Sequence, residues 1–104
     1  MVKEMTMEEY AQALASSKLV LIDFYADWCV PCQTMKGVLN EVSVEMDDKV
    51  DFYKANAEEL DQLSMDYKVR NLPTIIFLRN GEVIKRVSWT MPKDKFVELV
   101  NSLL

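Results

Sequence analysis

Residues 19–32 read Leu-Val-Leu-Ile-Asp-Phe-Tyr-Ala-Asp-Trp-Cys-Val-Pro-Cys, and this stretch decides how the chain folds. Its first part is a short apolar run rich in strand-forming residues, which predicts a buried strand over residues 18–26. Its last part is a Cys-x-x-Cys pair. Beyond the pair, apolar residues recur at helical spacing and predict a helix over residues 32–47: Met35, Val38, Leu39, Val42 and Met46. We therefore expect both cysteines between a buried strand and the start of a helix.

Local signals predict the other elements. Thr6 and Glu9 have the spacing of a capping box at the start of a helix. Asn80-Gly81 is a strong signal for a tight hairpin. Pro92 suits the first turn of a last helix, where its missing N–H costs nothing. Besides the strand over residues 18–26 and the helix over residues 32–47, we expect three further helices, over residues 7–16, over residues 57–67 and from near residue 92. We expect three further strands, over residues 50–56, 74–78 and 82–88.

This order of elements predicts an α/β fold. Helices alternate with strands until a hairpin follows, and that arrangement favours a three-layer α/β/α sandwich with a central mixed sheet. The chain of 104 residues is long enough for one domain and too short for two, so we expect a single domain over residues 1–104.

Charge and composition narrow the function. The net charge of −5 argues against a nucleic-acid partner, because phosphate binding needs a basic face. No apolar run approaches the length of a membrane span, so we expect no membrane partner. The N-terminal residues lack the pattern of a secretory signal, which favours a cytoplasmic location. We expect a monomer.

The chain has two cysteines and no histidine. The absence of histidine excludes Ser-His and Cys-His nucleophilic catalysis and leaves no imidazole for a metal. Thiol chemistry is the strongest remaining candidate. A thiolate of Cys29 at a helix N-terminus is stabilised by unpaired N–H groups and the helix dipole. Cys29 would attack a substrate disulfide, and Cys32 would then attack Cys29 and release the reduced substrate.

Two other interpretations of the pair stay open. In the first, the pair forms half of a zinc or iron–sulfur site that a dimer completes, since one chain supplies only two thiols. Alternatively it is a structural disulfide, although so small a loop restricts the unfolded chain little.

Residues 23–32, Asp-Phe-Tyr-Ala-Asp-Trp-Cys-Val-Pro-Cys, resemble the active-site segment of the thioredoxin family. Residues 68–74, Lys-Val-Arg-Asn-Leu-Pro-Thr, and the Asn80-Gly81 hairpin resemble later landmarks of that family at the expected distances. The resemblance covers essentially the whole chain. It implies the thioredoxin fold and a protein-disulfide reductase that is recycled by a thioredoxin reductase, acts on disulfide-containing client proteins and needs no bound cofactor.

The resemblance also implies roles for single residues. Asp23 matches a buried aspartate that helps move the proton of Cys32, and desolvation would raise its pKa. The alternative is a strand-end carboxylate that turns to solvent. Lys54 matches a lysine near that aspartate, although by itself it is as well explained as a surface charge. Pro73 matches a cis-proline that faces the disulfide.

A docking surface around Cys29 follows from the same resemblance. The main chain of the residue before the cis-proline pairs with bound substrate in the family, and Leu72 occupies that position here. The expected substrate-binding residues are Trp28, Val30, Pro31, Leu72 and Pro73.

Three positions depart from the family pattern. Val30 replaces the usual glycine after the first cysteine. Gly37 stands where a proline commonly kinks the helix, and we expect a bend there. The glycine after the last strand is absent, and Trp89 lies in that segment. Trp89 either extends the docking surface or fills the core.

Functions of other classes remain as alternatives. One is a more oxidising or isomerising protein of the same fold, which Val30 would favour. Another is a binding module whose thiols only switch or stabilise a contact with a partner. A glutaredoxin-like role is disfavoured, because the Trp28-Cys-x-Pro-Cys site and Asp23 follow the thioredoxin pattern.

Overall fold

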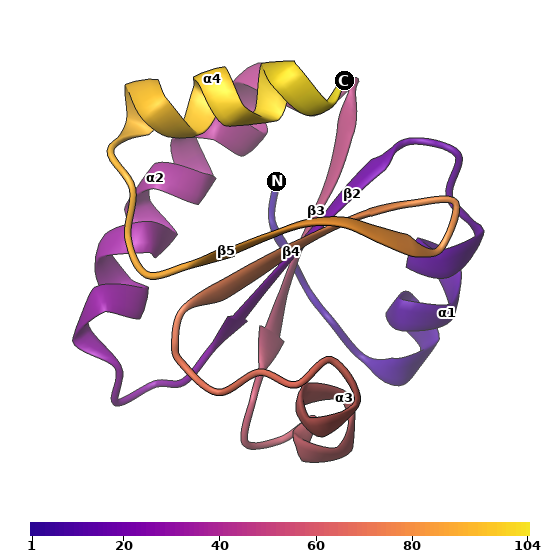
Figure 1. The fold of residues 1–104 in the computed structure, drawn as a ribbon, viewed down its shortest axis with the longest axis vertical. Helices are drawn as coiled ribbons and strands as arrows, with labels where there is room; N and C mark the ends of the chain where they lie inside the picture. The colour runs from indigo at the N-terminus through magenta and orange to yellow at the C-terminus, as the bar shows by residue number, and fades with distance from the viewer.

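A five-stranded mixed sheet forms the centre of the computed structural model, which describes residues 1–104 (Figure 1). The chain runs through nine elements in the order β1 (Lys3–Glu4), α1 (Met7–Ala15), β2 (Leu19–Tyr25), α2 (Val30–Met46), β3 (Val50–Asn56), α3 (Asp61–Asp66), β4 (Thr74–Arg79), β5 (Glu82–Ser88) and α4 (Lys93–Leu103). The strand order is β1-β3-β2-β4-β5. The first three of these neighbours are parallel, and β4 and β5 join them in antiparallel pairing.

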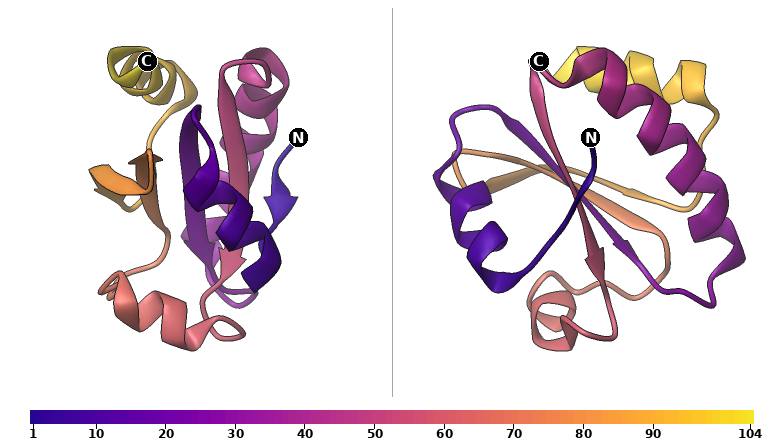
Figure 2. Two further views of the ribbon diagram at one scale, coloured as in Figure 1. Left: turned by 90° about the vertical axis from the view of Figure 1, so that its right-hand side faces the viewer. Right: turned by 180° about the vertical axis from the view of Figure 1, so that it is seen from behind.

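The helices lie in two layers on opposite faces of the sheet. Helices α2 and α4 cover one face, and α1 and α3 lie on the other side (Figures 1 and 2). Each face has its own apolar cluster: Leu21 and Phe77 pack with Met35 and Phe96 on the first face, and Ile22 packs with Ala13 and Leu63 on the second. This is the expected three-layer α/β/α sandwich.

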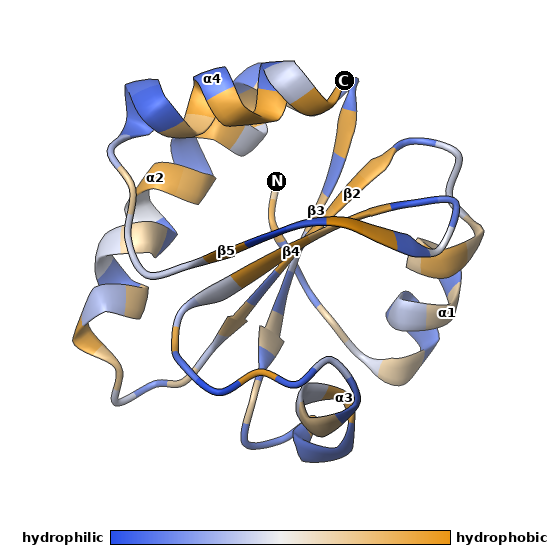
Figure 3. Cartoon of the chain, in the orientation of Figure 1, coloured by the Kyte–Doolittle hydropathy of each residue, from blue (hydrophilic) through white to orange (hydrophobic).

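Strand β2 is the central strand and carries the chain into the Cys-x-x-Cys pair. It is buried along nearly its whole length, because β3 and β4 pair with its two edges and helices cover its two faces. Figure 3 shows hydrophobic residues along the central strands and along part of α4. None of the helices combines the length and the apolar composition needed to cross a membrane.

Strand β1 is an element that the sequence did not predict. It contains only Lys3 and Glu4, pairs with β3, and places Glu4 opposite Lys54. Two exposed charged residues give no strand pattern of their own, so only the partner strand defines them as a strand.

Three helix starts differ from the predicted ones. Helix α2 begins at Val30, two residues before the predicted start at Cys32, because Cys29 caps it and proline is accepted in a first turn. Helix α3 begins at Asp61, because the side chain of Asn56 accepts hydrogen bonds from the N–H groups of Glu58 and Glu59 and holds a turn there. Pro92 is the N-cap of α4, with extended backbone, and does not lie in its first turn.

Candidate active site

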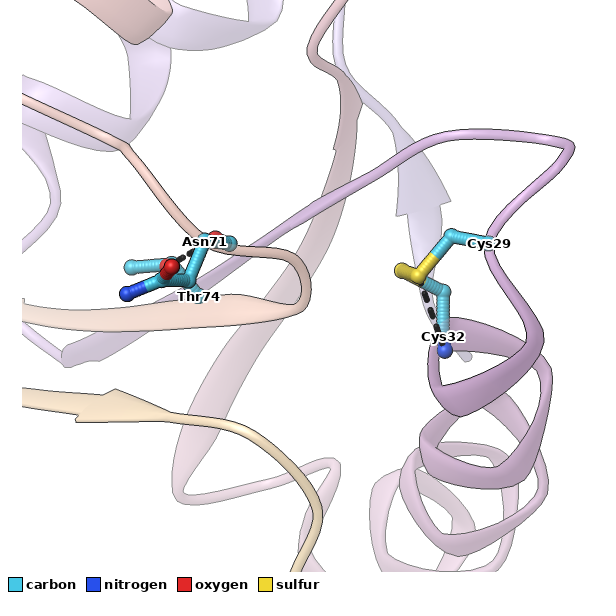
Figure 4. The surroundings of a disulfide bond; sticks show 4 residues. All are labelled: Cys29, Cys32, Asn71 and Thr74. Carbon is cyan, nitrogen blue, oxygen red and sulfur yellow. Dashed lines mark hydrogen bonds between the residues drawn. A yellow bond between two sulfur atoms is a disulfide. The ribbon is translucent and has the colours of Figure 1, made fainter.

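The cysteine pair lies at the N-terminus of α2, and the two residues form a disulfide (Figure 4). Their Cα atoms are 5.2 Å apart. Cys29 is the N-cap, and its Sγ accepts a hydrogen bond of 3.2 Å from the N–H of Cys32. An N–H group of the first helical turn therefore points at the sulfur of Cys29, and a helix N-terminus is an environment that stabilises a thiolate.

The two cysteines face different surroundings. Cys29 lines an exposed apolar groove, whereas Cys32 lines a separate, small polar cavity. Both residues are otherwise buried and pack with Ala26 and Leu72. This division gives each sulfur a separate environment: one opens toward a binding surface, and the other opens toward ionisable groups.

The loop before β4 lies against the disulfide. The Leu72–Pro73 peptide bond is cis, as the resemblance implied. The Thr74 hydroxyl donates a hydrogen bond of 2.5 Å to the carbonyl of Asn71 and closes the turn around this bond (Figure 4). Leu72 packs directly against the cysteine cluster.

Asp23 is buried in the middle of β2, with 4% of its surface exposed. This burial excludes the alternative of a strand-end carboxylate that turns to solvent. Burial raises the pKa of Asp23 from its usual 3.8 to about 7, and the nearby charge of Lys54 partly offsets that rise. Its Oδ1 atom accepts no hydrogen bond from the protein. A carboxylate in this state is available to exchange protons near neutral pH.

The polar cavity next to Cys32 has a volume of about 90 Å³. Asp23 and Lys54 both line it, and they are direct Cα partners in the β2–β3 ladder. Lys54 is therefore not a simple surface charge. Lys36 of α2 and Asp27 of the loop after β2 also line this cavity, and sequence reasoning did not single them out.

The apolar groove beside Cys29 has a volume of about 620 Å³, and eight of its twelve lining residues are hydrophobic. Trp28, Val30, Pro31 and Leu72 line it as expected. Pro73 does not line it, although its cis bond shapes the adjoining loop. Sequence reasoning missed several lining residues from α3 and the loop that follows it: Asp61, Ser64, Met65, Val69 and Arg70.

Trp89 also lines the groove, and 59% of its surface is exposed. The interpretation that it fills the core is therefore wrong. Its φ of 78° lies in the left-handed region, which bulky residues rarely adopt. Glycine adopts this backbone conformation at little cost. The Trp89 side chain stands here instead and lines the groove.

The structure gathers no group of three or more histidine, cysteine or acidic side chains suited to hold a metal ion. The cysteine pair is joined as a disulfide, and none of the ionisable residues around it completes a metal site.

Comparison with known proteins identifies the family of this chain. The family model for thioredoxin matches residues 1–102. The chain belongs to the thioredoxin family. It is 38% identical to the thioredoxin of Bacillus subtilis (strain 168) over 92 residues, covering 88% of each chain. It is 35% identical to the chloroplastic thioredoxin Y of Oryza sativa subsp. japonica over 103 residues, covering 98% of this chain and 61% of the rice protein. This chain therefore spans about three fifths of the length of that plant thioredoxin.

Solved thioredoxin structures share the fold. The germline-specific thioredoxin protein Deadhead from Drosophila melanogaster superposes with a TM-score of 0.89 at 28% identity, and the match covers 100% of both chains. The predicted family and the predicted thioredoxin fold are both confirmed.

Proposed function

We propose that this thioredoxin-family chain acts as one domain, residues 1–104, that reduces protein disulfides by dithiol–disulfide exchange. The observation that carries the proposal is that the two bonded cysteines line different cavities. Cys29 opens onto an apolar groove, and Cys32 opens onto the cavity of Asp23. A reductase needs this separation, because one sulfur must meet the client while the other loses a proton.

The exchange takes place in two steps. The Cys29 thiolate attacks one sulfur of the client disulfide, a Cys29–client disulfide forms, and the other client sulfur leaves as a thiolate that takes up a proton. The Cys32 thiol then loses its proton and attacks Sγ of Cys29, which forms the Cys29–Cys32 bond and releases the second client thiol. Two electrons pass from the dithiol to the client, and the protein ends in the oxidised state of the structure.

Asp23 assists the second step. Its carboxylate lines the same cavity as Cys32, and its raised pKa of about 7 makes it a useful proton acceptor near neutral pH. Lys54 lines the cavity as well and sets the charge around that carboxylate. We therefore assign Asp23 as the proton acceptor for Cys32 and Lys54 as the group that tunes it.

Clients dock in the apolar groove. Trp28 and Val30 are strongly exposed beside Cys29, and Pro31 and Leu72 complete the nearby wall. An extended client segment would pair its main chain with that of Leu72, next to the cis bond of Pro73. Trp89 adds an aromatic wall that the expected set did not include.

The cellular setting is part of the proposal. The dithiol is the redox centre, so no bound cofactor is needed. A thioredoxin reductase would return the disulfide to the dithiol, the chain would act as a monomeric electron carrier, and a reducing cytoplasm would suit it. The rice relative is named chloroplastic, and fractionation of cells that express the chain would decide between compartments.

Reduction of insulin by dithiothreitol tests the proposal. We expect the wild-type chain to accelerate the reaction, and the Cys29→Ser and Cys32→Ser variants to lose that acceleration. No acceleration by a folded and fully reduced wild-type chain would reject the reductase and favour a specialised oxidant or a binding module.

A further inference from the structure

Glu4, Lys54 and Asp23 stand in one row across three strands. Glu4 of β1 is the Cα partner of Lys54 in β3, and Lys54 is the Cα partner of Asp23 in β2. Partners in register on neighbouring strands project from the same face of a sheet. The two carboxylate residues therefore flank a single lysine, with β1 at the edge of the sheet and β2 at its centre.

Toward the sheet edge, Glu4 and Tyr25 form a binding site for the Lys54 ammonium. The Glu4 Oε1 atom lies 3.8 Å from Lys54 Nζ and accepts a hydrogen bond of 2.7 Å from the Tyr25 hydroxyl. The ammonium also lies 5.9 Å from the centre of the Tyr25 ring, which is within the range of a cation–π contact. Burial, followed by the bond to Glu4, raises the pKa of Tyr25, so this hydroxyl stays protonated and keeps donating.

Toward the centre of the sheet, Lys54 makes no such contact with Asp23. No ion pair joins Lys54 to Asp23, and the Oδ1 atom of Asp23 is buried without a hydrogen bond. Both residues nevertheless line the same cavity. The other charged groups that face this cavity are Asp27 and Lys36. The lysine therefore has a carboxylate on each side and contacts only the outer one.

We propose that Glu4 is a positioning residue that, with Tyr25, holds the Lys54 ammonium toward the sheet edge and keeps it from pairing with Asp23. This inference rests on the proposed function, because it concerns the group that accepts the proton of Cys32. Glu4 acts through Lys54 and does not touch the reacting sulfurs. The sheet edge thus controls how basic the buried carboxylate is.

Removal of the Glu4 charge has a defined consequence. In a Glu4→Gln variant, Lys54 loses its outer partner and turns toward Asp23. An opposite charge at ion-pair distance lowers a carboxyl pKa by about 1–3 units. Since Lys54 already lowers the Asp23 pKa from its present position, we expect a further fall of about half a unit.

A thermodynamic cycle with Lys54 separates this positioning effect from the direct charge of Glu4. The pKa of the Asp23 carboxyl is measured by carbon-13 NMR in four oxidised proteins: wild type, Glu4→Gln, Lys54→Met and the double variant. We expect Glu4→Gln to lower the pKa in the wild-type background and to leave it unchanged in the Lys54→Met background. Glu98→Gln removes an exposed carboxylate of α4 and is the matched control, for which we expect no shift.

Two results would overturn the inference. A fall of equal size in both backgrounds would show that Glu4 acts by its own charge, and no fall in either would show that it has no influence on Asp23. Tyr25→Phe removes the hydrogen bond that fixes Glu4, and it should lower the Asp23 pKa in the same direction, so the test does not depend on one variant.

The effect of Glu4 on the reaction itself is measured by a second readout, the pH dependence of the resolving step. The pH profile of the resolving step, followed as release of a reduced peptide from its disulfide with Cys29, should shift to lower pH in Glu4→Gln by the same half unit. The NMR cycle uses oxidised protein in which neither thiol titrates. A chain that fails to reduce insulin but shows the predicted cycle would reject the proposed function and keep the role of Glu4.

Discussion

The main-chain N–H of Trp89 donates a hydrogen bond of 2.9 Å to the carbonyl of Pro73. This bond ties the residue after β5 to the cis-proline before β4, so the two loops that flank the groove are held together. It also holds Trp89 in its left-handed backbone conformation, with the indole beside the groove. This bond therefore fixes the main-chain position from which the Trp89 side chain reaches the groove.

The Trp89→Gly variant separates docking from stability. Left-handed backbone costs a bulky residue about 1–2 kcal/mol, and glycine removes that strain while adding freedom to the unfolded chain. We expect a free energy of unfolding within about 1 kcal/mol of wild type in urea. The loss of the aromatic wall should lower kcat/KM for insulin reduction about fivefold, which corresponds to about 1 kcal/mol of binding.

A core role for Trp89 would give the opposite pattern. Truncation of a buried tryptophan lowers the free energy of unfolding by about 3–5 kcal/mol. That loss, together with unchanged kinetics, would contradict the assignment of Trp89 to the docking surface. Trp89→Ala keeps the strained backbone and should lose activity to a similar extent, which makes it the matched variant.

The Asp23→Asn variant tests the state of the buried carboxyl. The folded-state pKa of about 7 lies above the ordinary 3.8, so the folded protein binds more protons than the unfolded chain between these values. The contribution of Asp23 to wild-type stability therefore falls as the pH rises from about 4 to 7. A shift of about three units corresponds to a loss on the order of 4 kcal/mol.

An asparagine carries no charge, so the variant should not show this fall. Urea denaturation of the oxidised proteins should give similar free energies of unfolding at pH 4 and a more stable variant at pH 8. Equal stability of the two proteins at pH 8 would show that Asp23 ionises without a penalty and would contradict its role as a tuned base.

The Gly37→Ala variant tests a position inside α2. Gly37 is exposed, lies within a helix that runs from Val30 to Met46, and has nothing within 4 Å of where a Cβ would stand. Alanine in a helix interior is favoured over glycine by about 1 kcal/mol. We expect the free energy of unfolding to rise by that amount in urea, with unchanged insulin reduction. A destabilised variant would show that the glycine serves a need for conformational freedom there.

Most of the fold was predictable, because its signals are local. The apolar run of β2, the helical spacing after Cys32 and the Asn80-Gly81 turn each predicted an element that the structure contains. Strand β1 was not predictable, since Lys3 and Glu4 become a strand only through pairing with β3. The late start of α3 follows from a turn at residues 57–60, which the Asn56 side chain holds by accepting hydrogen bonds from Glu58 and Glu59 and which propensity alone does not reveal.

The site was predictable only where a motif marked it. The cysteine pair, Asp23 and Pro73 follow the family pattern. The structure places Asp23 and Cys32 on one cavity, packs Leu72 against the cysteines and makes the Leu72–Pro73 bond cis. Glu4 lies in no motif, and the motif that includes Tyr25 does not reveal its contact with Glu4, because the relation of both residues to Lys54 arises from register across three strands. Met65 and Arg70 reach the groove from α3 and the loop that follows it, and a sequence does not show which face of a sheet such a segment covers.

Covalent trapping tests the central claim, that Cys29 attacks the client and Cys32 resolves the product. Reduced Cys32→Ser and Cys29→Ser proteins are each mixed with oxidised insulin, and the adducts are measured by intact-mass spectrometry. We predict that Cys32→Ser accumulates a disulfide adduct through Cys29 and that Cys29→Ser forms far less, because Cys32 faces the Asp23 cavity and not the groove. Equal trapping by both variants, or trapping by Cys29→Ser alone, would contradict the account.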